Sequence, residues 1–151
     1  MTISYSHVSV FDQTLQKTHA WLDSLTHQAH LENHSQAYSA LRAVLHALRD
    51  RLTVEEATDL GAQLPMLVRG IYYEGWNPSK TPHKQERHLQ PFLDDISREM
   101  RNASLTIDPV HAARSVFGLL QDKVSAGEIR DIKQMLPQEI RELWPEQREA
   151  A

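Results

Sequence analysis

The chain contains at residues 40–72 the stretch ALRAVLHALRDRLTVEEATDLGAQLPMLVRGIY, and at residues 112–144 the stretch AARSVFGLLQDKVSAGEIRDIKQMLPQEIRELW. The two stretches align without a gap at an offset of 72, and ten of the 33 aligned positions are identical. A match of this length indicates internal duplication rather than a shared helical composition. The sequence therefore predicts two copies of one helical unit.

Apolar residues in the first copy recur at spacings of three and four, which places them on one face of a helix. They are Leu41, Val44, Leu45, Leu48 and Leu52. Thr53 with Glu56 then forms a capping box, in which the hydroxyl accepts from the amide of Glu56 and that carboxylate reaches back. Pro65 suits the first turn of a short third helix that runs through Tyr72.

The second copy has the same order of helix start and end signals. Asp108 and Pro109 predict an N-cap and a first helical position, and an apolar stripe follows. Ser125 with Glu128 is the matching capping box. A last helix begins at Pro137 and carries the apolar residues Ile140, Leu143 and Trp144, until Pro145 ends it.

A longer helix is expected before each unit. The stripe of the first comprises Phe11, Leu15, Thr18, Leu22, Leu25 and Ala29. It predicts a helix over residues 9–30, roughly 30 Å long at 1.5 Å per residue. The second helix begins near Pro91. We therefore predict an all-α single domain of about eight helices in two related four-helix halves, residues 1–74 and 91–151, with a linker over residues 75–90.

Composition excludes several function classes. The 151 residues carry a net charge of −4 and contain no Cys, which excludes disulfides, thiolate metal sites and a Cys nucleophile. Residues 1–75 hold 5 basic and 8 acidic side chains and residues 76–151 hold 11 and 12, so neither half has the excess that nucleic acid requires. No apolar run is long enough to cross a membrane and no signal peptide is visible, so we expect a cytoplasmic protein.

Several segments resemble the bacterial domain of unknown function 2267 family. They are FDQTLQKT at 11–18, WL at 21–22, AYSALRAVLHALRDRL at 37–52, GAQLPMLVRGIYYEGW at 61–76 and MLPQEIRELW at 135–144. The resemblance covers nearly the whole chain and implies a helical domain with tandem halves. It implies no activity and no catalytic residues, and the pair His27 and His30 departs from the family pattern.

His27 and His30 are the candidate metal ligands. Nine His are present, six of them before residue 50, and an i, i+3 pair on a helix could share a divalent ion. No second tight cluster completes a four-ligand site, so a solvated helix face is the favoured interpretation. We expect no cofactor.

The aromatic segment 72–76 provides the candidate binding surface. Tyr73 and Trp76 lie beside Arg69 and Lys84, so they could stack on a ligand or anchor a partner protein. The alternative is packing over the seam between the halves, and Tyr72, the repeat mate of Trp144, is expected in the core.

Charged residues also recur between the copies, at Arg42/Arg114, Asp50/Asp122, Asp59/Asp131 and Arg69/Arg141. Their duplication favours salt bridges within each unit over a single catalytic pocket. Phosphate loops, nucleophile elbows and zinc-protease motifs are absent. The sequence thus favours a non-enzymatic module that binds a protein partner or a second copy of itself. The alternative is a small-molecule or metal sensor that uses His27 and His30, or an anion site at Arg69 and Lys84.

Overall fold

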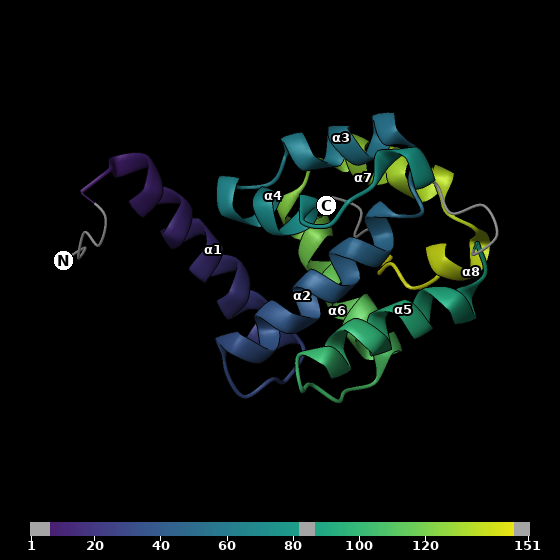
Figure 1. Cartoon of the computed structure of the whole chain (residues 1–151), viewed down its shortest axis with the longest axis horizontal. Helices are drawn as coiled ribbons and strands as arrows, with labels where there is room; N and C mark the ends of the chain where they lie inside the picture. Colours follow the sequence, from purple (N-terminus) through teal and green to yellow (C-terminus); the bar gives the residue numbers. More distant parts are fainter. Residues whose placement is uncertain (1–6, 82–86, 147–151) are drawn as a thin grey trace.

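The computed structural model describes residues 7–81 and 87–146. Every regular element within these two ranges is helical, as the sequence predicts (Figure 1). The elements are α1 Ser9–Gln28, α2 His34–Arg49, α3 Val54–Ala62, α4 Met66–Tyr73, the short 3₁₀ helix η1 Pro78–Lys80, α5 Leu89–Asn102, α6 Pro109–Lys123, α7 Ala126–Met135 and α8 Gln138–Arg141.

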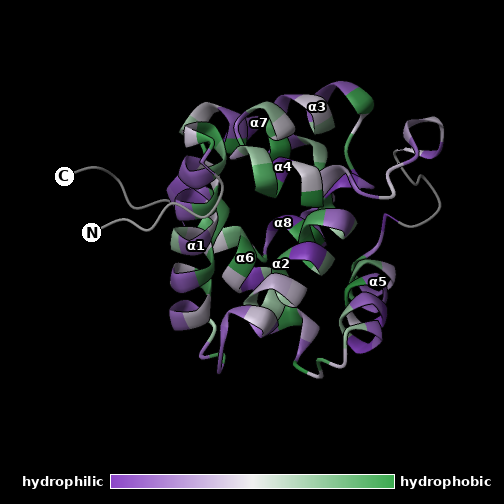
Figure 2. Ribbon diagram, turned by 60° about the vertical axis from the view of Figure 1, so that its left-hand side comes forward, coloured by the Kyte–Doolittle hydropathy of each residue, from purple (hydrophilic) through white to green (hydrophobic). Residues whose placement is uncertain are grey.

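Helix α2 is the centre of the packing. It contacts α1, α4, α5 and α6, while α3 and α7 lie against each other at one end of the molecule (Figures 1 and 2). Ten of its residues are buried, and the predicted stripe of Leu41, Val44, Leu45 and Leu48 is fully buried among them. The core therefore forms around the helix whose apolar pattern the duplicated stretch shows most clearly.

The predicted helix starts are confirmed by their caps. The Thr53 hydroxyl accepts from the amide of Glu56 at 3.2 Å, and the Ser125 hydroxyl accepts from that of Glu128 at 3.3 Å. Asp108 caps α6 through the amide of Val110 at 3.0 Å. Each of these contacts satisfies an amide that has no partner within its own helix.

An equivalent contact recurs at an offset of 72 near the ends of α3 and α7. Arg69 donates from Nε to the carbonyl of Gly61 at 2.8 Å and from Nη2 to that of Leu64 at 3.0 Å. Arg141 donates in the same way to Lys133 at 2.8 Å and to Leu136 at 2.9 Å. These matched contacts agree with a duplicated unit, while superposition of the two whole units stays a prediction.

The structure corrects three details of the predicted pattern. Helix α8 ends at Arg141 and does not continue to Pro145, because the chain tightens into turns in which the amides of Leu143 and Trp144 donate to carbonyls three residues back. Phe11 is 49% exposed instead of packing inward. Arg42 pairs with Glu99 of α5, whereas its repeat mate Arg114 is exposed, so the charged residues do not form the same network in both copies.

No helix among the described residues is long and apolar enough to cross a membrane. This finding agrees with the hydropathy pattern of the sequence.

Loss of the Thr53 cap tests the predicted start of α3. Thr53→Ala should lower the free energy of unfolding by about 1 kcal/mol, because the amide of Glu56 loses its acceptor. Ser125→Ala should have a similar effect on α7. Urea unfolding measures both, with the exposed Thr58→Ala on α3 as the control. An unchanged midpoint in both cap variants would contradict the assignment.

Candidate functional site

The apolar face of α1 continues beyond the part that the core covers. Its buried residues are Thr18, Trp21, Leu22 and Leu25, all at or beyond the tenth of its 20 residues. In Figure 1 the first half extends to the left, beyond the body of the other helices. There α1 contacts the short helix α4, which is too short to cover it fully. Phe11 therefore stays exposed although it follows the same stripe.

Helix α4 adds further apolar surface beside this segment. Pro65 precedes its first turn, where Met66 is 48% and Leu67 is 39% exposed. The amide of Leu67 donates to the Thr14 hydroxyl at 3.0 Å, which fixes the start of α4 against α1. The exposed apolar side chains of the two helices therefore lie at one end of the molecule.

A groove of about 230 Å³ lies between these two helices. Its lining comprises Val10, Gln13, Thr14, Lys17, Leu64, Pro65, Met66 and Arg69. We call it the α1/α4 groove. It combines apolar side chains, such as Val10 and Met66, with the cationic groups of Lys17 and Arg69. A surface of this composition suits an apolar side chain of a partner that has an acidic residue beside it.

Arg69, predicted as a binding residue, serves both the groove and the fold. Its guanidinium caps the end of α3 through two carbonyls, and the same side chain lines the α1/α4 groove. Removal of Arg69 would therefore change stability as well as any binding.

The aromatic pair packs largely on the protein itself. Tyr73 and Trp76 stack with their ring centroids 5.4 Å apart, and both pack against the core. A Cβ atom on Gly61 would lie 2.1 Å from the Tyr73 hydroxyl oxygen, so any larger residue at position 61 would displace this ring. Burial raises the pKa of Tyr73, although the charge of Arg69 lowers it. Lys84, the fourth predicted binding residue, lies outside the described residues.

The two predicted metal ligands lie at the end of α1. His27 is in its last turn and His30 follows in a left-handed conformation with φ 55°, and both are exposed. Within residues 7–81 and 87–146, neither belongs to a group of three side chains that could hold an ion. The structure therefore adds no ligand to this pair.

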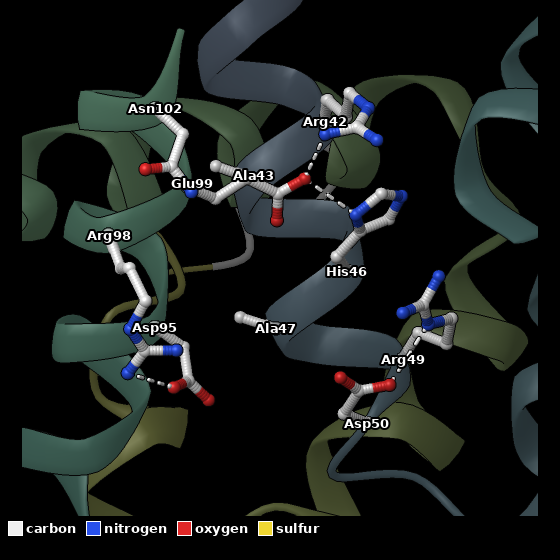
Figure 3. Close-up of a pocket in the computed structure, with 10 residues that line it drawn as sticks. All are labelled: Arg42, Ala43, His46, Ala47, Arg49, Asp50, Asp95, Arg98, Glu99 and Asn102. Atoms are coloured by element: carbon white, nitrogen blue, oxygen red, sulfur yellow. Dashed lines mark hydrogen bonds and ion pairs between the residues drawn. The ribbon is translucent and has the colours of Figure 1, made fainter. Parts of the chain in front are cut away.

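A larger polar pocket of about 500 Å³ lies between α2 and α5 (Figure 3). Arg42 donates to the Glu99 carboxylate and pairs with Glu74 at 3.3 Å. Burial lowers the pKa of Arg42, but the carboxylates of Glu99 and Glu74 outweigh it and raise that pKa above its ordinary value. Arg49 pairs with Asp50 at 3.0 Å, and Arg98 pairs with Asp95 at 3.0 Å.

His46 is the buried centre of this pocket. Its Nδ1 lies 2.7 Å from a Glu99 carboxylate oxygen, and its Nε2 lies 2.7 Å from the Ile71 carbonyl oxygen. Both ring nitrogens therefore lie within hydrogen-bond distance of an oxygen atom. Each charged side chain of the pocket faces a partner of opposite charge. The contacts of Arg42 and His46 with Glu99 therefore stabilise the packing of α2 against α5.

Sequence reasoning missed a group of carboxylates at the contact of α3 with α7. Ligand atoms of Glu56, Glu128 and Asp131 lie within 4.8 Å of one another. We call these three residues the carboxylate cluster. Burial raises the pKa of Glu128 to about 7, helped by the charge of Glu56 and their hydrogen bond, and burial also raises the pKa of Glu56. The recurrence of glutamate at 56 and 128 and of aspartate at 59 and 131 was the available signal.

Comparison with known proteins gives one family. The model described as "Uncharacterized conserved protein (DUF2267)" matches residues 18–143, so the carboxylate cluster lies within the match and residues 9–17 of α1 precede it. No curated protein matches the chain.

Proposed function

The chain belongs to the DUF2267 family of uncharacterized conserved proteins, and from this premise we propose that it is a protein-interaction module that binds through the α1/α4 groove. The family carries no activity to transfer, so the proposal rests on surface chemistry. We assign no catalytic step to the chain, and its expected cytoplasmic location rests on the sequence alone.

The observation that supports this proposal is the concentration of exposed apolar side chains beside the groove. Of seven large apolar residues that are exposed among the described ones, five lie at the start of α1 or α4. These are Val8, Val10, Phe11, Met66 and Leu67. Val10 and Met66 line the groove, and the other three lie within two residues of one of them in the sequence. Single exposed apolar residues are ordinary, whereas such a group beside a groove is typical of an interaction site.

The chemistry of the groove favours an amphipathic helix of a partner protein. A volume of about 230 Å³ accommodates one or two anchoring side chains rather than a large ligand. Lys17 and Arg69 at the groove would face acidic residues on that helix. Helix-in-groove recognition uses such apolar anchors at spacings of three and four.

The double substitution Val10→Ser with Met66→Ser tests the proposal, because both side chains line the α1/α4 groove. Both side chains are about half exposed, so the free energy of unfolding should fall by no more than about 1 kcal/mol, at about 0.5 kcal/mol for each substitution. Binding should be lost, since the apolar anchors of the surface are removed. Sedimentation velocity over a concentration series measures self-association, and quantitative pull-down from the source cell measures capture of partners.

Val54→Ser is the matched control, because Val54 is 41% exposed on α3 and does not line the groove. It should retain every partner that the double variant loses. Trp76→Ala tests the aromatic surface that the sequence favours. The α1/α4 groove is the wrong site if Trp76→Ala removes capture at an unchanged unfolding midpoint while the double variant retains it.

A further inference from the structure

The carboxylate cluster is formed by corresponding positions of two helices. Glu56 is the third residue of α3 and Glu128 is the third residue of α7, so the Thr53 and Ser125 caps place both in first turns. The contact between α3 and α7 then brings the two side chains together. Asp131 follows one turn after Glu128, and Asp59 occupies the same place after Glu56.

Glu56 and Glu128 are buried, with 9% and 8% of their surfaces exposed. The Oε1 atom of each is buried and accepts no hydrogen bond. A hydrogen bond between the two carboxyl groups leaves these Oε1 atoms unsatisfied. A buried carboxylate oxygen without a donor or a cation is unfavourable, because it has lost its hydration and gained no partner.

The surroundings add negative charge instead of removing it. Asp131 and Asp59 are exposed, and their charges raise the pKa of Glu128 further. No ion pair within the described ranges includes any of these four carboxylates. Three carboxylates therefore converge here, and two of their buried oxygens have no hydrogen-bond partner. No neighbouring side chain among the described residues supplies the positive charge that would balance them.

We propose that Glu56, Glu128 and Asp131 bind a divalent cation that prefers oxygen ligands, with Asp59 at the edge of the site. The two buried glutamates supply the inner ligands, and the exposed Asp131 supplies a ligand from the solvent side. Mg²⁺, Ca²⁺ and Mn²⁺ prefer carboxylate oxygens, whereas Zn²⁺ in proteins prefers nitrogen and sulfur. The bound ion would join α3 to α7 and thereby couple the two copies of the duplicated unit.

Mn²⁺ is the probe that tests the site. Chelator-treated protein at pH 7.5 is titrated with MnCl₂ while electron paramagnetic resonance measures free ion and a thermal melt measures stability. We expect one Mn²⁺ per chain, a rise in melting temperature, and competition by Ca²⁺ or Mg²⁺. Glu128→Gln, which retains the shape of the side chain, should weaken binding at least tenfold without lowering the metal-free melting temperature.

Two control variants separate the carboxylate cluster from exposed acidic groups and from the histidine pair. Glu55→Gln removes an exposed carboxylate next to Glu56 and should bind Mn²⁺ like the wild type. His27→Ala with His30→Ala should also bind normally, which excludes the histidine pair. The proposal is overturned if wild-type protein binds no Mn²⁺, since the glutamates then only share a proton, or if Glu128→Gln binds it equally well. Neither result depends on the α1/α4 groove.

Discussion

Leu48→Ala should lower the free energy of unfolding by about 2–5 kcal/mol, and Leu120→Ala should do so by a similar amount. Both side chains are fully buried, Leu48 in α2 and Leu120 in α6, and these two helices contact each other. Each truncation removes apolar contacts and leaves a cavity that the neighbouring helices fill only in part. Urea unfolding measures the effect as a shift of the midpoint.

The cap variant Thr53→Ala provides the scale for this comparison, with an expected loss of about 1 kcal/mol. Val54→Ala is a second control, because Val54 is 41% exposed. If the cap variant proved more destabilising than either leucine variant, our assignment of core and surface would be wrong. If only Leu48→Ala were destabilising, the second copy would not contribute to the same cooperative core.

The sequence is sufficient to predict the helices because the determinants are local. Spacings of three and four place the stripe of α2, and Thr53, Asp108 and Ser125 mark three helix starts that the structure confirms. The core role of Tyr72 is confirmed as well, with its hydroxyl donating to the Ala57 carbonyl at 2.7 Å. These features depend on neighbours within about one helical turn or on the matched position of the other copy.

The contacts that build the candidate sites connect residues far apart in the chain. Glu99 meets Arg42 and His46 across more than fifty residues, so no local pattern reveals the polar pocket. The capping-box pattern predicts that the Glu56 carboxylate reaches back to its own helix start, and the structure corrects this. The Thr53 cap is present, but the Glu56 carboxylate turns toward Glu128. Duplication marks both glutamates, and only the contact of α3 with α7 shows that they converge.

The exposed first turns of α1 show a second limit of prediction from sequence. A periodic apolar stripe predicts which face of a helix is apolar, but not how far the neighbouring helices extend along it. Phe11 and Leu25 belong to one stripe, yet Leu25 is fully buried and Phe11 is 49% exposed. The α1/α4 groove exists because α4 covers this face only in part.

The burial of Glu128 predicts that the metal-free protein becomes less stable as pH rises. Its pKa is about 7 in the folded state against 4.5 for an exposed glutamate, because burial and the nearby Glu56 disfavour its charge. Between these values the folded chain binds more protons than the unfolded chain, so the free energy of unfolding falls with increasing pH. The loss should reach up to about 3 kcal/mol above pH 7, at 1.36 kcal/mol per pKa unit.

Glu128→Gln removes the titrating group. It also removes the electrostatic repulsion between the Glu128 carboxylate and Glu56, Asp59 and Asp131. The variant should therefore lose most of this pH dependence and become more stable than the wild type at pH 8 in the presence of a chelator. Urea unfolding at several values between about pH 5 and pH 8 measures both slopes. The difference between the two proteins isolates the contribution of Glu128 from that of every other titrating group. Glu55→Gln should keep the wild-type slope, and an equal slope in Glu128→Gln would show that Glu128 is ionised throughout.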